Sequence, residues 1–304
     1  MKRRLLGEAL LLMVAVSWGV GFIAMRYALS WLPTLTLLAV RFLLSFVSLA
    51  LVFPSRVFRA KRDTWWRGAL IGLFLTLGFV PQTFAMLYTS INTVAFLTGM
   101  YVVLVPLFQA LLLRKAPGTL SAVGAVLSVT GLGILCLQPG EGLGLGLGEL
   151  LGFLCAVGYA MHIISVGRFA PEEDPVAITA AQLLAAFLYT GVLAVTLEPL
   201  PARMEVGPAI TVIYLVLCNT LGAMLIQNWA QQVTEPTRAA LLLATEPVFA
   251  ALGSYFLLGE VIGLKGFIGD LLIFSGMVMS QVESFREPGR ARPETVKEVC
   301  GGAR

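Results

Sequence analysis

The sequence predicts an all-α polytopic membrane protein, with ten transmembrane helices arranged as two inverted five-helix repeats. Three observations lead to this fold class: the chain is strongly apolar, its apolar segments can span a bilayer, and its two halves match each other. Of the 304 residues, 58% are hydrophobic and 12% are charged. Soluble proteins carry roughly 25% charged residues, so this chain lacks the polar side chains that a water-exposed surface needs. Lipid contact removes that need.

Ten apolar segments are the expected transmembrane helices. A helix rises ~1.5 Å per residue, so each segment can cross a hydrocarbon core of ~30 Å. The first segment is longer than the apolar region of a signal peptide, and we expect it to be retained. The segments are continuous, whereas the strands of a membrane β-barrel alternate in polarity. The expected spans are residues 5–29, 33–53, 65–87, 91–113, 118–137, 148–170, 175–197, 207–231, 237–258 and 263–282.

The basic residues predict the orientation, because cytoplasmic loops are enriched in Lys and Arg. With a cytoplasmic amino terminus, three basic residues fall outside (Arg26, Arg203 and Lys265) and Arg41 lies within a span. The pattern predicts a plasma (inner) membrane protein with both termini cytoplasmic, and it explains the net charge of +4 without a nucleic-acid partner. The cytoplasmic set is Lys2, Arg3, Arg4, Arg56, Arg59, Lys61, Arg62, Arg67, Arg114, Lys115, Arg168, Arg238, Arg286, Arg290, Arg292, Lys297 and Arg304.

The two halves match at a nearly constant offset. The offset is 141 in the first two spans, where Trp18 corresponds to Tyr159, and 145 from the third span, where Gln82 corresponds to Gln227. Five spans is an odd number, so the second unit enters the membrane upside down, as in many transporters. The expected domains are a first repeat (1–137), an outer Gly-rich connector (138–147), a second repeat (148–282) and a mobile cytoplasmic tail (283–304).

Several short motifs follow one another along almost the whole chain. They are Ala15-Val16-Ser17-Trp18-Gly19, Arg41-Phe42, Ala85-Met86-Leu87-Tyr88-Thr89-Ser90, Thr245-Glu246-Pro247-Val248-Phe249-Ala250 and Leu257-Leu258-Gly259-Glu260. By these motifs the chain, from residue 5 to about 280, resembles the EamA-type transporters of the drug/metabolite transporter superfamily. The resemblance implies two repeats around a substrate cavity, and export or exchange of small metabolites, amino acids among them. One departure is Arg114-Lys115 in the first repeat, where the second has Gly259-Glu260; roles of that family glutamate would apply only to Glu260.

Three ionisable residues within spans are candidates for substrate binding or ion coupling. Glu246 lies near the middle of its span, beside Pro247, which deprives the helix of a hydrogen bond. It could recognise a cation or amine, couple a proton, or bond another helix. Arg41 could bind a substrate carboxylate, although a structural partner is the favoured reading. His162 could relay protons, although a neutral, buried histidine is favoured.

Aromatic and amide residues complete the candidate site. Trp18, Tyr101, Tyr159 and Trp229 could form cavity walls that hold organic solutes by stacking or cation–π contacts, or could simply pack against lipid and neighbouring helices. Gln82 and Gln227 could line a wet path or bond another helix. One histidine and no CxxC pair give no metal site, and we expect no cofactor.

The sequence therefore predicts a secondary exporter of small organic solutes, such as amino acids or drug-like molecules, that works by alternating access. No Walker motif is present, so a proton gradient or exchange for a second solute would supply the energy. The alternatives are an intramembrane enzyme, disfavoured because no HExxH or GxSxG motif occurs, and a non-transporting lipid-binding or assembly protein. The expected partners are the solute and the bilayer, and an oligomer is compatible with the sequence.

Overall fold

In the computed structural model, the described residues are 2–112, 119–136, 146–199, 209–259 and 263–286, and they form helices joined by short turns, with no strand among them. The helices are α1 (Lys2–Ala28), α2 (Thr34–Val52), α3 (Pro54–Phe58), α4 (Arg62–Tyr88), α5 (Ile91–Gly99), α6 (Tyr101–Leu112), α7 (Thr119–Cys136), α8 (Leu147–Phe169), η1 (Ala170–Glu172), α9 (Pro175–Leu197), α10 (Ala209–Ile213), the π-helix η2 (Tyr214–Gly222), α11 (Ala223–Ala230), α12 (Pro236–Leu243), α13 (Glu246–Leu258) and α14 (Leu264–Arg286). The all-α prediction is confirmed for this part of the chain.

Eight helical stretches among the described residues are long and apolar enough to cross a membrane. They coincide with eight of the predicted spans, often to within a few residues. The other two predicted spans correspond to α7, whose apolar stretch covers only Ala122–Ile134, and to α14. The ten-span count therefore remains a prediction.

Large apolar side chains cover much of the outside of the bundle. Leu51 and Leu264, for example, are 76% and 77% exposed. A soluble monomer rarely shows extended apolar patches, and lipid tails are the environment that suits such a surface.

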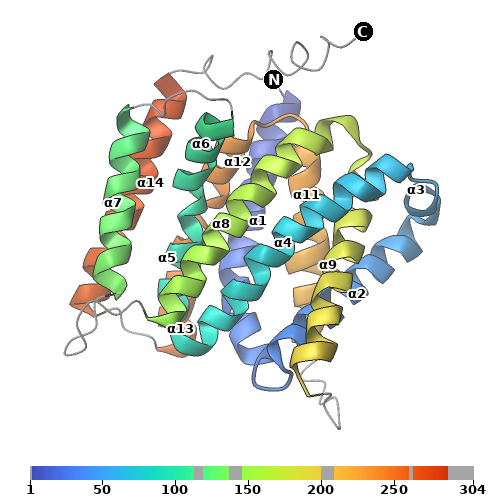
Figure 1. Ribbon diagram of the computed structural model, residues 1–304, viewed down its shortest axis with the longest axis horizontal. Helices are drawn as coiled ribbons and strands as arrows, with labels where there is room; N and C mark the ends of the chain where they lie inside the picture. Colours follow the sequence, from blue (N-terminus) through green and yellow to red (C-terminus); the bar gives the residue numbers. More distant parts are fainter. Residues whose placement is uncertain (1, 113–118, 137–145, 200–208, 260–262, 287–304) are drawn as a thin grey trace.

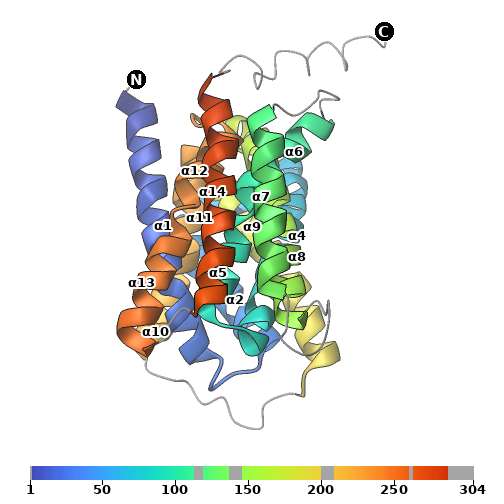
Figure 2. The same ribbon diagram turned by 90° about the vertical axis from the view of Figure 1, so that its left-hand side faces the viewer.

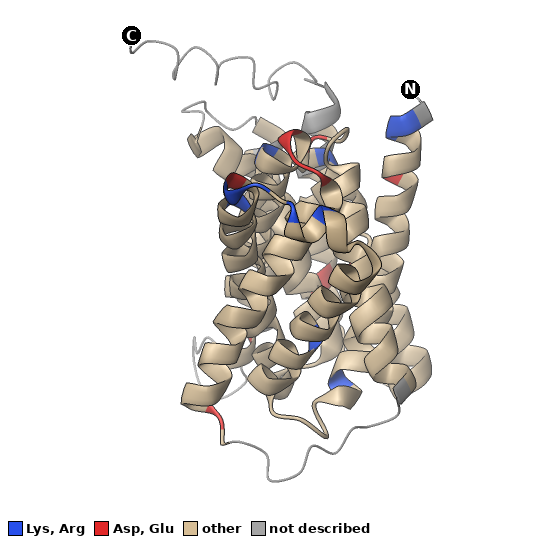
Figure 3. Cartoon of the chain, turned by 90° about the vertical axis from the view of Figure 1, so that its right-hand side faces the viewer, with Lys and Arg blue, Asp and Glu red and all other residues tan. Residues whose placement is uncertain are grey.

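The first and last described residues lie at the same end of the helix bundle. Figures 1 and 2 show α1 starting, and α14 finishing, at this end. In contrast, α8 starts at the opposite end, so the first helices of the two halves run in opposite directions (Figure 1). Most of the charged residues coloured in Figure 3 also gather at the end that holds the amino terminus. This is the asymmetry on which the predicted orientation rests.

Glycines let helices from different parts of the chain approach closely. A Cβ on Gly158 of α8 would lie 2.5 Å from the backbone nitrogen of Gly78 in α4. A Cβ on Gly131 of α7 would lie 2.6 Å from the carbonyl oxygen of Gly269 in α14. Small residues at such crossings bring backbones together, which is how membrane helices gain packing energy without a hydrophobic driving force.

Side-chain carboxylates cap the starts of α9 and α2. The Asp174 carboxylate accepts hydrogen bonds from the backbone N–H groups of Val176 and Ala177 (3.0 and 3.1 Å), which starts α9. Glu198, just after α9, accepts from the N–H groups of Leu35 and Thr36 (2.7 and 2.8 Å) at the start of α2. These contacts satisfy amide groups that a helix start leaves unpaired. The Glu198 contact also ties the two halves together.

Two expected spans are interrupted in the middle. One is divided at Met100 into α5 and α6, and another at Ala244–Thr245 into α12 and α13. The second break lies where Pro247 is expected to deprive the helix of a hydrogen bond, because α13 begins at Glu246 with Pro247 in its first turn. The break at Met100 was not predicted.

Several predictions concern residues outside the described ranges. Most of the connector (138–147), most of the cytoplasmic tail (283–304) and Glu260 belong to this group, as do the basic residues Arg114, Lys115 and Arg203.

Candidate functional site

A cavity of about 30 Å³ lies in the interior of the bundle. By this measure a water molecule needs roughly 10–15 Å³, so the cavity has room for about two waters. Its walls come from α1, α2, α4, α6, α8, η2, α11 and α13, and therefore from both halves of the chain. The lining residues are Trp18, Gly21, Phe22, Met25, Arg41, Phe79, Gln82, Thr83, Met86, Tyr101, Tyr159, His162, Ile163, Asn219, Gln227 and Glu246.

The cavity brings together eight of the nine residues singled out in the sequence. They are Trp18, Arg41, Gln82, Tyr101, Tyr159, His162, Gln227 and Glu246. Six of them form pairs at the repeat offsets of 141 and 145 residues: Trp18 with Tyr159, Gln82 with Gln227, and Tyr101 with Glu246. The two halves thus contribute matched positions to one site.

Glu246 occupies the first position of α13, directly after the break in its span. Its side chain is buried, with 4% of the residue exposed, and it lines the cavity. Within the described part of the chain, no basic side chain forms an ion pair with it. A helix start carries partial positive charge, which favours a carboxylate there. Its exposure to the cavity leaves Glu246 available to a bound cation, amine or proton.

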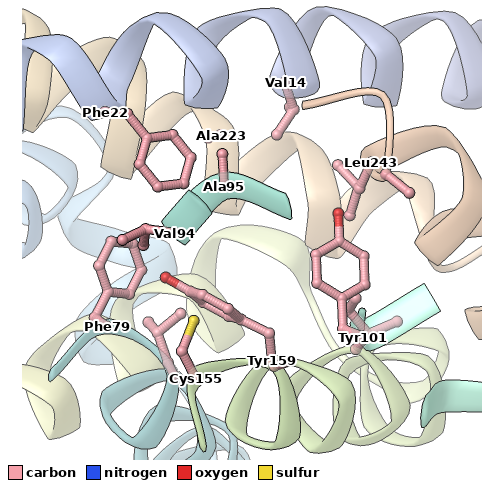
Figure 4. Close-up of a cluster of buried hydrophobic side chains, with 14 of the residues drawn as sticks. Val14, Phe22, Phe79, Val94, Ala95, Tyr101, Cys155, Tyr159, Ala223 and Leu243 are labelled. Atoms are coloured by element: carbon pink, nitrogen blue, oxygen red, sulfur yellow. The ribbon is translucent and has the colours of Figure 1, made fainter. Parts of the chain in front are cut away.

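Tyr101 begins α6, directly after the equivalent break at Met100. Its ring belongs to the apolar core, and its hydroxyl points toward Leu243 at the end of α12 (Figure 4). This buried hydroxyl has no hydrogen-bond partner among the described residues. An unpaired hydroxyl beside a cavity is a group that a bound solute or water can satisfy.

Arg41 of α2 is almost completely buried and is held by the π-helix η2. Its Nη2 donates to the Asn219 side-chain oxygen at 2.5 Å, and its Nε donates to the Thr220 hydroxyl. The guanidinium carbon also lies 4.7 Å from the centre of the Phe79 ring, a cation–π contact. These contacts agree with a structural role for Arg41, which is the role that the sequence favours.

These contacts orient the Arg41 guanidinium but do not neutralise it. Its partners are amide, hydroxyl, thioether and ring groups, and no carboxylate of the described residues lies within ion-pair distance. A buried charge of this kind is costly unless it is compensated. Because Arg41 lines the cavity, a carboxylate of a bound solute could supply the missing negative charge.

A chain of hydrogen bonds crosses the site between the two halves. The Tyr159 hydroxyl donates to the Gln82 side-chain oxygen (2.9 Å), and the Gln82 amide donates to the Thr98 hydroxyl (3.2 Å). Thr98 in turn lies 3.4 Å from the Cys155 sulfur. The Tyr159 ring packs edge-on against Phe79, with ring centres 5.5 Å apart. Gln82 and Tyr159 therefore have structural partners as well as a place in the cavity wall.

His162 and Gln227 are held by other amides. The His162 Nε2 lies 3.3 Å from the side-chain oxygen of Gln182, which is the repeat equivalent of Arg41. The Gln227 amide donates to Gln231 at 2.9 Å, while the Gln227 side-chain oxygen has no partner among the described residues. His162 matches the favoured reading of a buried histidine with one partner.

Of the two tryptophan candidates, only Trp18 lines the cavity. Its indole N–H donates to the Asn219 carbonyl oxygen at 3.0 Å. Trp229 lies elsewhere, with the Arg3 guanidinium 5.7 Å from its ring centre. Trp229 follows Gln227 by two positions, and residues two apart in a helix point about 200° apart. If Gln227 faces the cavity, Trp229 must face away.

Several lining residues were not anticipated. Asn219 is the most informative, because it binds Arg41 and also donates to the Ser17 carbonyl oxygen at 2.7 Å. Phe79 was also missed, although it contacts both Arg41 and Tyr159. A usable signal existed for Asn219, since an amide within a span usually bonds another helix or lines a wet path.

Comparisons with known proteins agree with this architecture. The chain is 26% identical over 279 residues to an "Uncharacterized transporter" of Archaeoglobus fulgidus, covering 91% of this chain and 86% of the relative. It is 21% identical over 282 residues to the "Uncharacterized transporter YvbV" of Bacillus subtilis, covering 90% and 91%. A solved crystal structure shares the fold with a TM-score of 0.66 at 19% identity, covering 92% of this chain and 98% of that chain.

A family model settles the relationship. The model of the EamA-like transporter family matches residues 5–137 and again residues 146–281. These two matches cover nearly all of the apolar part of the chain. The chain therefore belongs to the EamA-like transporter family and is an integral membrane transporter.

Proposed function

We propose that the protein is a secondary transporter that exports small organic metabolites, such as amino acids or drug-like solutes, by alternating access around the central cavity. The observation that carries this proposal is that both halves line one buried cavity containing a carboxylate, Glu246, and a cation, Arg41, neither of which forms an ion pair within the described part of the chain. The aromatic rings of Trp18, Tyr101 and Tyr159 add apolar wall. A solute with both charges and an apolar part would fit these groups.

The proposed topology is ten spans in two inverted repeats, 1–137 and 148–282, with both termini on the cytoplasmic side of the plasma membrane. Support comes from the opposite directions of α1 and α8 and from the interruptions at 100 and 244–245, which lie about 145 residues apart. The concentration of charged residues at the end of the bundle with the amino terminus favours the cytoplasmic assignment of that end.

The size of the cavity supports alternating access rather than an open pore. Space for about two waters is too small for a metabolite, so a solute requires the lining helices to separate. Interrupted helices at the centre of inverted repeats are a common way to build such a site. The breaks before Tyr101 and Glu246 are natural hinges for this movement. Proton movement or exchange of a second solute would drive export.

The test is radiolabelled solute counterflow in proteoliposomes with purified protein. Pools of amino acids and of organic cations and anions are screened first with the wild type. Glu246→Gln is then compared with Glu235→Gln, a matched change at an exposed position just before α12. We expect Glu246→Gln to lose flux, or the response of flux to pH, and Glu235→Gln to behave as the wild type.

Two results would count against the proposal. Absence of counterflow for every pool with folded wild-type protein would contradict transport and favour a lipid-binding or assembly role. Unchanged flux and pH response in Glu246→Gln would remove this carboxylate from binding and coupling.

A further inference from the structure

A second buried carboxyl group lies outside the cavity, on α14. Asp270 is the seventh residue of this helix, about 9 Å along it at ~1.5 Å per residue. Only 5% of the residue is exposed, and it does not line the cavity. The Asn92 amide at the start of α5 donates to its Oδ2 at 2.6 Å. Asn92 is equally buried, with 4% exposed.

This pair of side chains has too few hydrogen-bond donors for its acceptors. Both the second oxygen of Asp270, Oδ1, and the side-chain oxygen of Asn92 are buried without a hydrogen-bond partner among the described residues. An ionised carboxylate and an amide oxygen are both acceptors, so neither can satisfy the other. A proton on Asp270 turns the carboxyl group into a donor and supplies what the pair is missing. A buried acceptor left unpaired costs about 1–3 kcal/mol, and more when it is charged.

The surroundings of Asp270 offer no ready counter-charge in the described part of the chain. The helices packed against α14 are α5, α6, α7 and α12. Of these, α5 and α7 carry no Asp, Glu, Lys, Arg or His, α6 carries Tyr101, and α12 carries Arg238. On α14 itself, Lys265 precedes Asp270 by five residues and is exposed, while Glu283 and Arg286 lie at the far end. No ion pair with Asp270 occurs among the described residues.

A proton fits this place better than a metal cation does. Ca²⁺, for example, takes six to eight oxygen ligands. No group of three or more His, Cys, Asp or Glu side chains that could hold a metal occurs among the described residues. The pair itself offers two unpartnered oxygens, which are too few to surround an ion.

The helix that carries Asn92 also contacts a residue of the cavity wall. At the other end of α5, a Cβ on Gly99 would lie 2.5 Å from the Met277 Cε of α14 and 3.0 Å from the Pro247 Cγ, next to Glu246. Thr98, beside Gly99, accepts the hydrogen bond from Gln82 in the cavity wall. One short helix therefore contacts Asp270 at its first turn and Gln82, a residue of the cavity wall, at its last.

We infer that Asp270 and Asn92 form a proton-binding site, separate from the solute cavity, whose occupancy controls the contact between α14 and α5. Loss of the proton to water leaves a carboxylate with an unpaired oxygen, which favours separation of α14 from α5 and entry of water. Return of the proton restores the contact. The transfer of this movement to Glu246 through α5 rests on the proposed function, whereas proton binding itself does not.

Proton binding can be measured directly, because the chain contains only three aspartates, Asp63, Asp174 and Asp270. Protein labelled with ¹³C at the aspartate carboxyl carbons is titrated in lipid bilayers by solid-state NMR. Asp63 and Asp174 are exposed and serve as internal references. We expect one signal to stay in the protonated position at a pH where the other two have ionised, and to be missing in Asp270→Asn. A carboxyl signal of Asp270 that ionises together with the references would overturn the inference.

The coupling is tested by solute counterflow at several pH values. Asp270→Asn keeps the shape of the side chain and can donate permanently to Asn92, so we expect the pH response of flux to be lost. The control is Glu149→Gln, a half-exposed carboxylate at the start of α8 that bonds Thr89. A wild-type pH response in Asp270→Asn would refute coupling through this site. A protonated Asp270 in a protein without any flux would instead refute the proposed function and leave the proton site standing.

Discussion

Substituting Gly158 with Ala tests whether close contact between α4 and α8 holds the two halves together. The added Cβ would lie 2.5 Å from both the Gly78 nitrogen and the Leu77 carbonyl oxygen. These are backbone atoms, so no side-chain rotation relieves the overlap. Ordinary contact begins near 3.4 Å, and the helices must therefore separate by about 0.9 Å, a gap at which dispersion contacts lose a quarter to a half of their energy.

The magnitude follows from comparison with a glycine that has space. A Cβ on Gly191, in α9, would meet only the Phe187 ring, at 3.6 Å or more. Replacing glycine by alanine within a helix gains up to ~1 kcal/mol of helix propensity in either place. Overpacking costs typically about 1–3 kcal/mol. Since the propensity gain cancels, Gly158→Ala should be about 1–3 kcal/mol less stable than Gly191→Ala.

The assay is equilibrium unfolding in mixed micelles with increasing SDS, followed by circular dichroism, with both variants and the wild type in the same detergent. Gly191→Ala should unfold at the same or a higher SDS fraction than the wild type, and Gly158→Ala at a lower one. Equal midpoints for the two variants would show that α4 and α8 do not cross where the structure places them, and the packing argument would fail.

Two further predictions concern contacts between the halves. Glu198→Gln replaces the carboxylate that accepts hydrogen bonds from the backbone N–H groups of Leu35 and Thr36. Hydrogen bonds to charged groups contribute about 1.5–3 kcal/mol, so the SDS midpoint of unfolding should fall. An unchanged midpoint would show that Glu198 does not stabilise the start of α2. Asn219→Ala removes the side-chain acceptor of Arg41, and the same energy range predicts at least about a tenfold drop in counterflow. The control is Thr179→Val, which removes a bond from Asn228 and a bond to the Pro175 carbonyl oxygen, neither of them to a lining residue of the cavity, and should keep its flux. Equal flux in the two variants would contradict the role given to Asn219.

Much of this arrangement is encoded locally and could be predicted. Each span is an apolar segment bounded by charge, Pro or Gly, and the helices follow these boundaries closely. The interruption before Glu246 was predictable because Pro247 cannot donate a backbone hydrogen bond. The inward position of Gln82 and Gln227 followed from their polarity, since an amide within a span needs a partner or water.

Other features depend on contacts that no local pattern reveals. Arg41 bonds two consecutive residues of the π-helix η2, Asn219 and Thr220, and no local sequence pattern indicates that these residues meet Arg41. The partner of Arg41 was therefore not predictable. Trp229 was a candidate for the cavity wall because of its aromatic ring, although its spacing from Gln227 argued against that place. Asp270 was visible as an intramembrane carboxylate and was still overlooked.

The break at Met100 shows how the repeat carries information that local sequence does not. Pro247 lies two residues after Thr245, in the first turn after its break. After Met100, in contrast, the first proline is Pro106, six residues on. Subtracting the offset of 145 from Thr245 nevertheless gives residue 100. The backbone of one half therefore predicts the backbone of the other even where the residues differ, and Tyr101 and Glu246 occupy equivalent positions in the two repeats. The same fold position holds a neutral hydroxyl in one half and a carboxylate in the other, so the backbone is nearly symmetric while the chemistry of the cavity is not. Under the proposed function, a solute bound there would meet charge mainly from Arg41 and Glu246.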